Sequence, residues 1–88
     1  MKMIIAIIQD HDTEPVSRAL TSMNFRVTQI ASTGGFLRRG SSTLLTGVAD
    51  DQVDQALQLI RDTCSIQSDT SQKRATIFVL NVARHVQF

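Results

Sequence analysis

An apolar run at the start of the chain, Met1–Ile8, does most to limit the possible folds. It is rich in isoleucine, a β-branched residue typical of strands, and its length suits a strand better than a helix. Apolar side chains stand at both odd and even positions, the odd set being Met3, Ile5 and Ile7 and the even set Ile4, Ala6 and Ile8. Because side chains of a strand alternate between two faces, this segment is predicted to be a strand covered on both faces.

Two later segments carry the apolar spacing of a helix face. The first is marked by Val16, Ala19, Leu20 and Met23, and the second by Val53, Ala56, Leu57, Ile60 and Cys64. Asp12 or Thr13 can cap the first helix and Asp50 can cap the second, since all three are residue types found at helix starts. Asn24 is predicted to end the first helix, because asparagine tolerates the left-handed conformation common there.

Three further strands are predicted, over Phe25–Ala31, Ser42–Val48 and Ala75–Val82. The first has period two, which places Arg26, Thr28 and Ile30 on one face and the remaining side chains on the other. The segment between this strand and the next is too short for a crossover helix, so the two strands should pair in antiparallel orientation.

The predicted order is strand, helix, strand, strand, helix, strand. In a single domain over residues 1–88, this order indicates the α+β, ferredoxin-like βαββαβ class, a four-stranded antiparallel sheet with both helices on one face. The other face of the sheet is then left without cover, although the first strand is apolar on both sides. An uncovered apolar face favours self-association, and we expect a small cyclic oligomer.

Composition narrows the partners and the compartment. Nine basic residues against eight acidic ones argue against nucleic acid as a partner. No apolar run approaches the roughly 20 residues that span a membrane, so no membrane partner is expected. The single cysteine, Cys64, cannot form an internal disulfide and suits a reducing compartment, so we expect a cytoplasmic protein.

The most informative polar segment is rich in glycine and arginine. All four glycines, Gly34, Gly35, Gly40 and Gly47, lie within fourteen residues, together with Arg38 and Arg39. Glycine lets a ligand approach the backbone, and arginine donates bidentate hydrogen bonds to phosphate, so one interpretation is a phosphate or nucleotide cradle. The other is an ordinary hairpin with a solvated arginine pair. Neither a Walker A motif nor a Rossmann fingerprint is present.

Other chemistry has weak support. His11 and His85 lack the spacing of metal ligands, and the carboxylates around residue 12 are explained more simply by a helix start. No nucleophile and base form a known local signature. The sequence gives no positive evidence for an enzyme, a metal or a cofactor.

The run Asn24-Phe25-Arg26-Val27-Thr28, followed by Thr33-Gly34-Gly35-Phe36-Leu37-Arg38 and Gly40, resembles the PII-like cyclic di-AMP receptors of Gram-positive bacteria. The opening strand and the final Gln87-Phe88 agree with the same family, so the match runs over nearly the whole chain. The resemblance implies a ferredoxin-like fold assembled as a homotrimer, with one cyclic dinucleotide in each of three clefts between subunits. It implies a signal receptor without catalysis that acts on a regulatory protein target.

The resemblance also implies a set of ligand-binding residues. Asn24, Arg26 and Thr28 would hold a base and a phosphate. Gly35, Phe36 and Leu37 would enclose an adenine, Ser41 would contact a base or ribose, and Gly47 would allow close approach to the backbone. Phe78 and Gln87 would complete the pocket from the adjacent subunit.

Three departures from the family pattern leave an alternative open. Ser41 stands where the family usually has asparagine, Ser65–Gln72 replaces a longer Gly- and Pro-rich loop, and Lys73-Arg74 replaces a glycine pair. The alternative is a diverged PII-like protein that binds another nucleotide or only protein partners. An enzyme or a metal-binding trimer on the same fold is a third hypothesis, for which the two histidines offer little.

Overall fold

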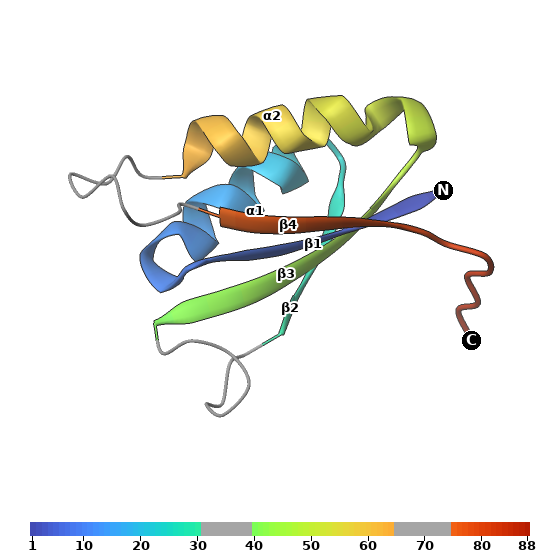
Figure 1. Cartoon of the computed structure of the whole chain (residues 1–88), viewed down its shortest axis with the longest axis horizontal. Helices are drawn as coiled ribbons and strands as arrows, with labels where there is room; N and C mark the ends of the chain where they lie inside the picture. The colour runs from blue at the N-terminus through green and yellow to red at the C-terminus, as the bar shows by residue number, and fades with distance from the viewer. Residues whose placement is uncertain (31–39, 65–74) are drawn as a thin grey trace.

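The computed structural model describes residues 1–30, 40–64 and 75–88 of the chain (Figure 1). Its regular elements are β1 (Lys2–Gln9), α1 (Thr13–Ser22), β2 (Arg26–Ile30), β3 (Ser41–Val48), α2 (Val53–Thr63) and β4 (Ala75–Asn81). A 3-10 turn precedes each helix, η1 (Asp10–Asp12) before α1 and η2 (Asp50–Gln52) before α2. The predicted order of strands and helices is therefore confirmed.

The four strands form one sheet in the order β2-β3-β1-β4, and each neighbouring pair is antiparallel. The predicted antiparallel pairing of the second and third strands is confirmed. Both helices pack on the same side of the sheet, and the strands run across beneath them in Figure 1. This is the ferredoxin-like α+β arrangement that the sequence predicted. Neither helix within the described ranges is long and apolar enough to cross a membrane.

The core lies between the sheet and the two helices. The even-numbered side chains of β1 point into it and are at most 1% exposed, namely Ile4, Ala6 and Ile8. They meet buried side chains of α1, α2 and β3, namely Val16, Leu20, Ala56, Ile60 and Leu44. Burying each large aliphatic side chain stabilises the fold by roughly 1.5–3 kcal/mol. Cys64 belongs to the same core, as the sequence predicted.

The end of α1 is set by Asn24, whose φ is 67°. The Asn24 N–H donates to the Thr21 carbonyl and the Phe25 N–H donates to the Leu20 carbonyl, both at 3.0 Å. This pair of bonds is a Schellman motif, in which the residue after the helix takes the left-handed conformation. The prediction that Asn24 ends the helix is confirmed. The turn then delivers Phe25 into the core, where it is 5% exposed.

Of the predicted helix caps, Asp12 stands at the N-cap position of α1, whereas Asp50 does not cap α2. Asp12 occupies the position before α1, but its side chain makes no capping hydrogen bond. Asp50 is not the cap of α2, because the turn η2 intervenes and the Asp50 carboxylate lies 3.0 Å from the N-terminal nitrogen of Met1. The pairing of β1 with β3 brings this ammonium beside Asp50, and a full positive charge attracts a carboxylate more strongly than a neutral backbone N–H does.

Candidate functional site

The sheet face that points away from α1 and α2, called the open face here, is defined by the strand register. Residues directly opposite each other in antiparallel strands project to the same face. Three rows of side chains cross the open face: Arg26, Gly47, Met3 and Leu80; Thr28, Leu45, Ile5 and Phe78; Ile30, Thr43, Ile7 and Thr76. The odd-numbered residues of β1 lie on this face, which the sequence predicted to be without cover from the helices.

Five of the predicted ligand-binding residues lie on the open face. Arg26 and Thr28 are exposed on the edge strand β2, and Phe78 is 52% exposed on the opposite edge strand β4. Gly47 lies directly opposite Arg26, and Ser41 begins the same strand, β3. The alternation of β2 predicted from the sequence is therefore confirmed for Arg26 and Thr28.

These five residues are spread over the face and do not form one compact pocket within a single copy. Ser41 and Gly47 are six residues apart on β3, which corresponds to about 20 Å of strand. Thr28 and Phe78 lie on opposite edges with two strands between them, which corresponds to about 14 Å. These five residues therefore do not converge on one point of a single copy.

The remaining predicted residues fall outside the open face or outside the described ranges. Asn24 is exposed in the turn before β2, two residues from Arg26, and its backbone conformation already gives it a role in the fold. Gln87 is exposed in the C-terminal segment, which leaves the sheet after β4 and runs away from it (Figure 1). Gly35, Phe36 and Leu37 lie outside the described residues.

Arg26 is the strongest candidate for binding an anion. Among the residues that the structure describes, no carboxylate forms an ion pair with its exposed guanidinium. A guanidinium without such a partner is available for bidentate hydrogen bonds to a phosphate. The hydroxyl of Thr28 lies one row away on the same strand and face, where it can add a further donor.

One hydroxyl on the open face, that of Thr43, is already buried within a single copy of the chain. Thr43 is 7% exposed, and its Oγ1 has no hydrogen-bond partner among the described residues. By contrast, Ser42 on the covered face donates its hydroxyl to Asp10 Oδ1 at 2.5 Å.

The sequence missed one residue of this region, Met1. A Cβ placed on Gly47 would lie 2.8 Å from Met1 Cε, so the end of the Met1 side chain rests on the glycine. The sequence did indicate this placement, because Met1 continues the odd-numbered series that places Met3 and Ile5 on the open face. It was overlooked because its contact with Gly47 forms only when β1 and β3 pair.

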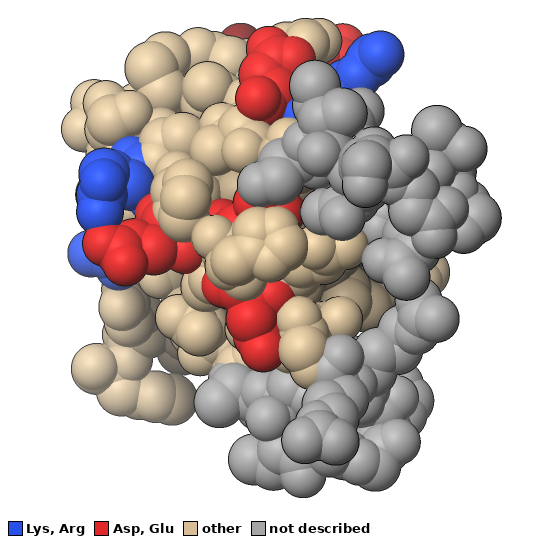
Figure 2. Space-filling model, turned by 90° about the vertical axis from the view of Figure 1, so that its left-hand side faces the viewer, with Lys and Arg blue, Asp and Glu red and all other residues tan. Residues whose placement is uncertain are grey.

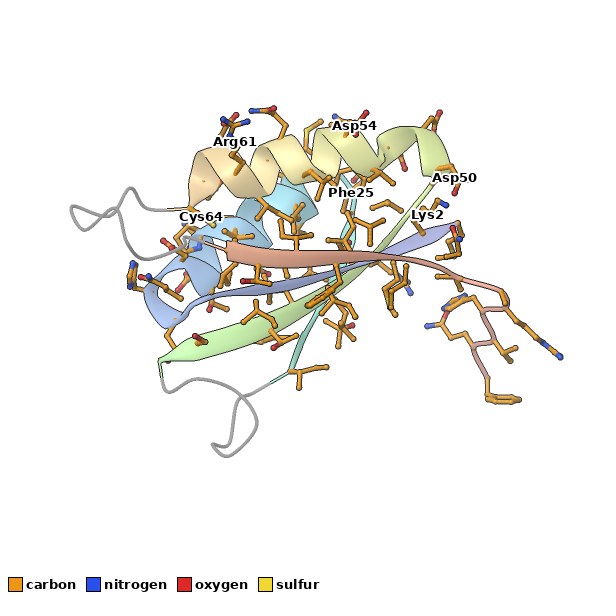
Figure 3. The ribbon with its side chains drawn as sticks, viewed as in Figure 1. Lys2, Phe25, Asp50, Asp54, Arg61 and Cys64 are labelled. Carbon is orange, nitrogen blue, oxygen red and sulfur yellow. The ribbon has the colours of Figure 1, made fainter. Side chains whose placement is uncertain are left out.

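Charges around the start of β1 hold this corner of the sheet in place. The N-terminal ammonium bonded to Asp50, and then the nearby charge of Lys2, lower the pKa of the Asp50 carboxyl below its ordinary value. Lys2 also donates to the side-chain oxygen of Asn81 on β4. Figure 3 shows Lys2 and Asp50 at the same end of the sheet, close to the chain start.

Several carboxylates lie on the described part of the opposite end of the molecule. Figure 2 shows carboxylate side chains gathered on the end where β1 passes into α1, with an Arg18–Glu14 ion pair on α1. His11 Nε2 lies 3.7 Å from Asp12 Oδ1 there. Within the described ranges, no group of three or more His, Cys, Asp or Glu side chains is placed to hold a metal ion.

Comparison with solved structures supports the fold. The chain superimposes on a functionally unknown protein from Pediococcus pentosaceus with a TM-score of 0.79 and 29% sequence identity, covering 99% of this chain and 96% of that one. Because that protein has no known function, the similarity supports the architecture of the whole chain and adds nothing about a ligand.

Comparison with protein families identifies the chain. The family model described as "Cyclic-di-AMP receptor" matches residues 1–75, a span that includes four of the predicted residues on the open face: Arg26, Thr28, Ser41 and Gly47. Phe78 and Gln87 lie beyond the matched span. Since the match covers most of the 88 residues, the chain belongs to the cyclic-di-AMP receptor family.

Proposed function

We propose that this protein is a cytoplasmic signal-transduction receptor that binds cyclic di-AMP between the subunits of a homotrimer. Its membership of a receptor family supports the ligand. The observation that carries the proposal is the Arg26–Gly47 pair on the open face, where a guanidinium with no ion-pair partner among the described residues lies beside a position that has no side chain. A phosphate bound to Arg26 can therefore approach the backbone of β3 closely.

The other predicted residues complete the proposed pocket. Thr28 donates its hydroxyl to the sugar-phosphate, and Phe78 offers an aromatic face to a purine. Asn24 and Ser41 supply polar contacts to a base or ribose. Gly35, Phe36 and Leu37 are proposed to enclose one adenine, and Gln87 is proposed to reach the ligand from a neighbouring subunit.

The build of the open face supports self-association, for which we propose a trimer. Its centre is apolar, with Ile5 and Leu45 half-buried, and its β4 edge exposes Phe78 and Leu80, the latter at 44%. Leaving so many apolar side chains in water is unfavourable, and contiguous apolar patches usually mark an interface. A ring closed by threefold symmetry places the β4 edge of one copy against the β2 edge of the next. Phe78 of one subunit then lies near Arg26 of its neighbour.

Titration calorimetry with cyclic di-AMP tests the proposal. We expect saturable binding of one ligand per chain, and weaker binding of cyclic di-GMP at the same site. Arg26→Ala removes the charge-assisted hydrogen bonds and should weaken binding by about 2 kcal/mol, or roughly 30-fold. Gln29→Ala is the matched control, because Gln29 is exposed on the same strand but projects to the other face.

The same purified protein can be used to distinguish a cyclic di-AMP receptor from the diverged receptor and from an enzyme. If cyclic di-AMP gives no heat with the folded protein, a thermal-shift panel of other nucleotides tests the diverged receptor. A ligand present at 100 times its dissociation constant adds about 2.7 kcal/mol to stability. Recovery of cyclic di-AMP intact after prolonged incubation is expected of a receptor. Its hydrolysis would show catalysis and contradict the proposal.

A further inference from the structure

We propose that the Met1 side chain is a ligand-contacting residue of the nucleotide site, held over Gly47 until a purine arrives and then packed against that purine. This inference rests on the proposed function. The inference adds one specificity-determining residue to the proposed site. Sequence motifs place most of that site in the glycine- and arginine-rich segment and β2, and Met1 lies outside both.

The backbone of Met1 is fixed at two points. Its nitrogen lies 3.0 Å from Asp50 Oδ1, and its carbonyl accepts a hydrogen bond from the Val82 N–H at 3.1 Å. The side chain, in contrast, is 46% exposed and is not part of the buried core. The backbone of Met1 is therefore fixed while its half-exposed side chain only rests on Gly47, which is the arrangement needed for a side chain that changes partner.

The tip of Met1 lies where the ligand is proposed to bind. Its Cε rests on Gly47, 2.8 Å from the position of a Cβ there, and Gly47 is directly opposite Arg26. Opposite residues in antiparallel strands have Cα atoms about 5 Å apart. A nucleoside phosphate bound by Arg26 above Gly47 would therefore bring its sugar or base close to the Met1 thioether.

Methionine suits this position chemically. Its side chain has three rotatable bonds and a polarisable sulfur that packs favourably against aromatic rings. The absence of a side chain at Gly47 gives the methyl group a resting place on the backbone when no ligand is bound. Because only the end of a flexible side chain occupies that space, a ligand displaces it at little cost.

Methyl NMR tests the inference directly, because the chain contains only three methionines, Met1, Met3 and Met23. Protein labelled with 13C at the methionine methyls is titrated with cyclic di-AMP, and calorimetry on the same sample measures binding. Met3→Leu and Met23→Leu assign the three signals. We expect the Met1 methyl to shift upfield under the ring current of adenine. Met23, which is 43% exposed at the end of α1, should stay in place.

Two acidic residues provide a matched pair of variants. Asp50→Asn removes the ion pair that holds the Met1 backbone and should weaken cyclic di-AMP binding about two- to fivefold. Asp51→Asn changes the charge equally at an exposed neighbour and should leave affinity unchanged. Gly47→Ala places a methyl where Met1 Cε rests, so the Met1 signal should move in the free protein while the fold is retained.

The outcomes are distinct. Saturable heat together with an upfield shift confined to Met1 and its open-face neighbour Met3 supports the inference. Saturable heat with an unmoved Met1 methyl overturns the inference and leaves the proposed receptor function standing. Folded protein that gives no heat overturns the proposed function, and the inference falls with it.

Discussion

The two faces of the sheet carry similar apolar residues, yet the chain covers only one of them. On β1, Ile4 and Ile8 are at most 1% exposed beneath the helices, whereas Ile5 and Ile7 are only half-buried on the open face. The same side chain therefore has different surroundings one residue further along the strand. The comparison teaches that the composition of a strand shows which of its faces must be buried. The topology decides which of those faces the chain itself buries.

Polar, aliphatic and aromatic side chains are distributed unevenly across the open face. Across the open face, the β2 edge is polar with Arg26 and Thr28, the centre is aliphatic, and the β4 edge is aromatic with Phe78. Such a gradient suits a partner that is apolar in its middle and anionic at one side. A second copy of the chain together with a bound phosphate meets both requirements.

The largest expected effect comes from truncating neighbouring isoleucines on opposite faces. Ile4→Ala should lower the free energy of unfolding by about 3–4 kcal/mol, because it leaves a cavity in the core. Ile5→Ala should cost about 1 kcal/mol in dilute protein, because its side chain is only half-buried there. Urea denaturation at low and high protein concentration measures both. Equal losses at low concentration would mean that the two faces are equally covered within one chain.

A charge placed on the open face should dissociate the proposed trimer. Leu45→Lys puts an unpaired ammonium at the centre of the proposed interface, which should cost about 3 kcal/mol per subunit. Gln29→Lys adds the same charge at an exposed position on the other face and should leave the assembly intact. Sedimentation velocity gives the mass and circular dichroism checks the fold. A Leu45→Lys protein that stays trimeric would place the interface elsewhere.

Two substitutions of Asn24 test how the chain turns from α1 towards the open face. Asn24→Ala should lower the stability of the fold by about 1–2 kcal/mol, because alanine is strained at a φ of 67°. Asn24→Gly tolerates this φ and should retain most of the stability. The glycine variant therefore isolates any contact between the side chain and the ligand. Thermal unfolding and calorimetry together assign the two roles, and equal stabilities would rule out the role in the fold.

The smallest effect concerns the corner where Met1 reaches the open face. The pKa of Asp50 is lowered in the folded protein, so its ion pair stabilises the fold above the ordinary carboxyl pKa and is lost as the pH falls through the lowered value. Acetylation of the N-terminus removes the ammonium charge and should raise the Asp50 pKa towards its ordinary value. Carboxyl NMR titration measures it. An unchanged value after acetylation would assign the shift to another group.

Much of this fold could be predicted from the sequence because local patterns decide it. The alternation in β2 places Arg26 and Thr28 together on one face, and Asn24 ends a helix whose spacing is regular. Local patterns cannot choose which side of β1 the helices cover, since both sides are apolar. That choice depends on the packing of α1 and α2, which lie elsewhere in the chain.

The errors have one physical origin, contacts between residues distant in sequence. Asp50 has the composition and position of a helix cap, but the ammonium brought beside it by the pairing of β1 with β3 is the stronger partner. Met1 was overlooked because its contact with Gly47 exists only once those strands pair. Likewise, only the pairing register of the strands shows that the predicted site residues are spread over about 20 Å.

The strand order has a consequence for how the protein is made. β1 is the first strand to leave the ribosome, yet it lies between β3 and β4, and Lys2 pairs with Asn81 at the far end of the chain. At roughly 5–20 residues per second, about 4–16 s of translation separate the two partners. During that time an isoleucine-rich strand has one edge without its final neighbour. The nascent chain therefore exposes an apolar strand edge during synthesis. Chaperones that bind extended apolar segments can bind the chain at this stage.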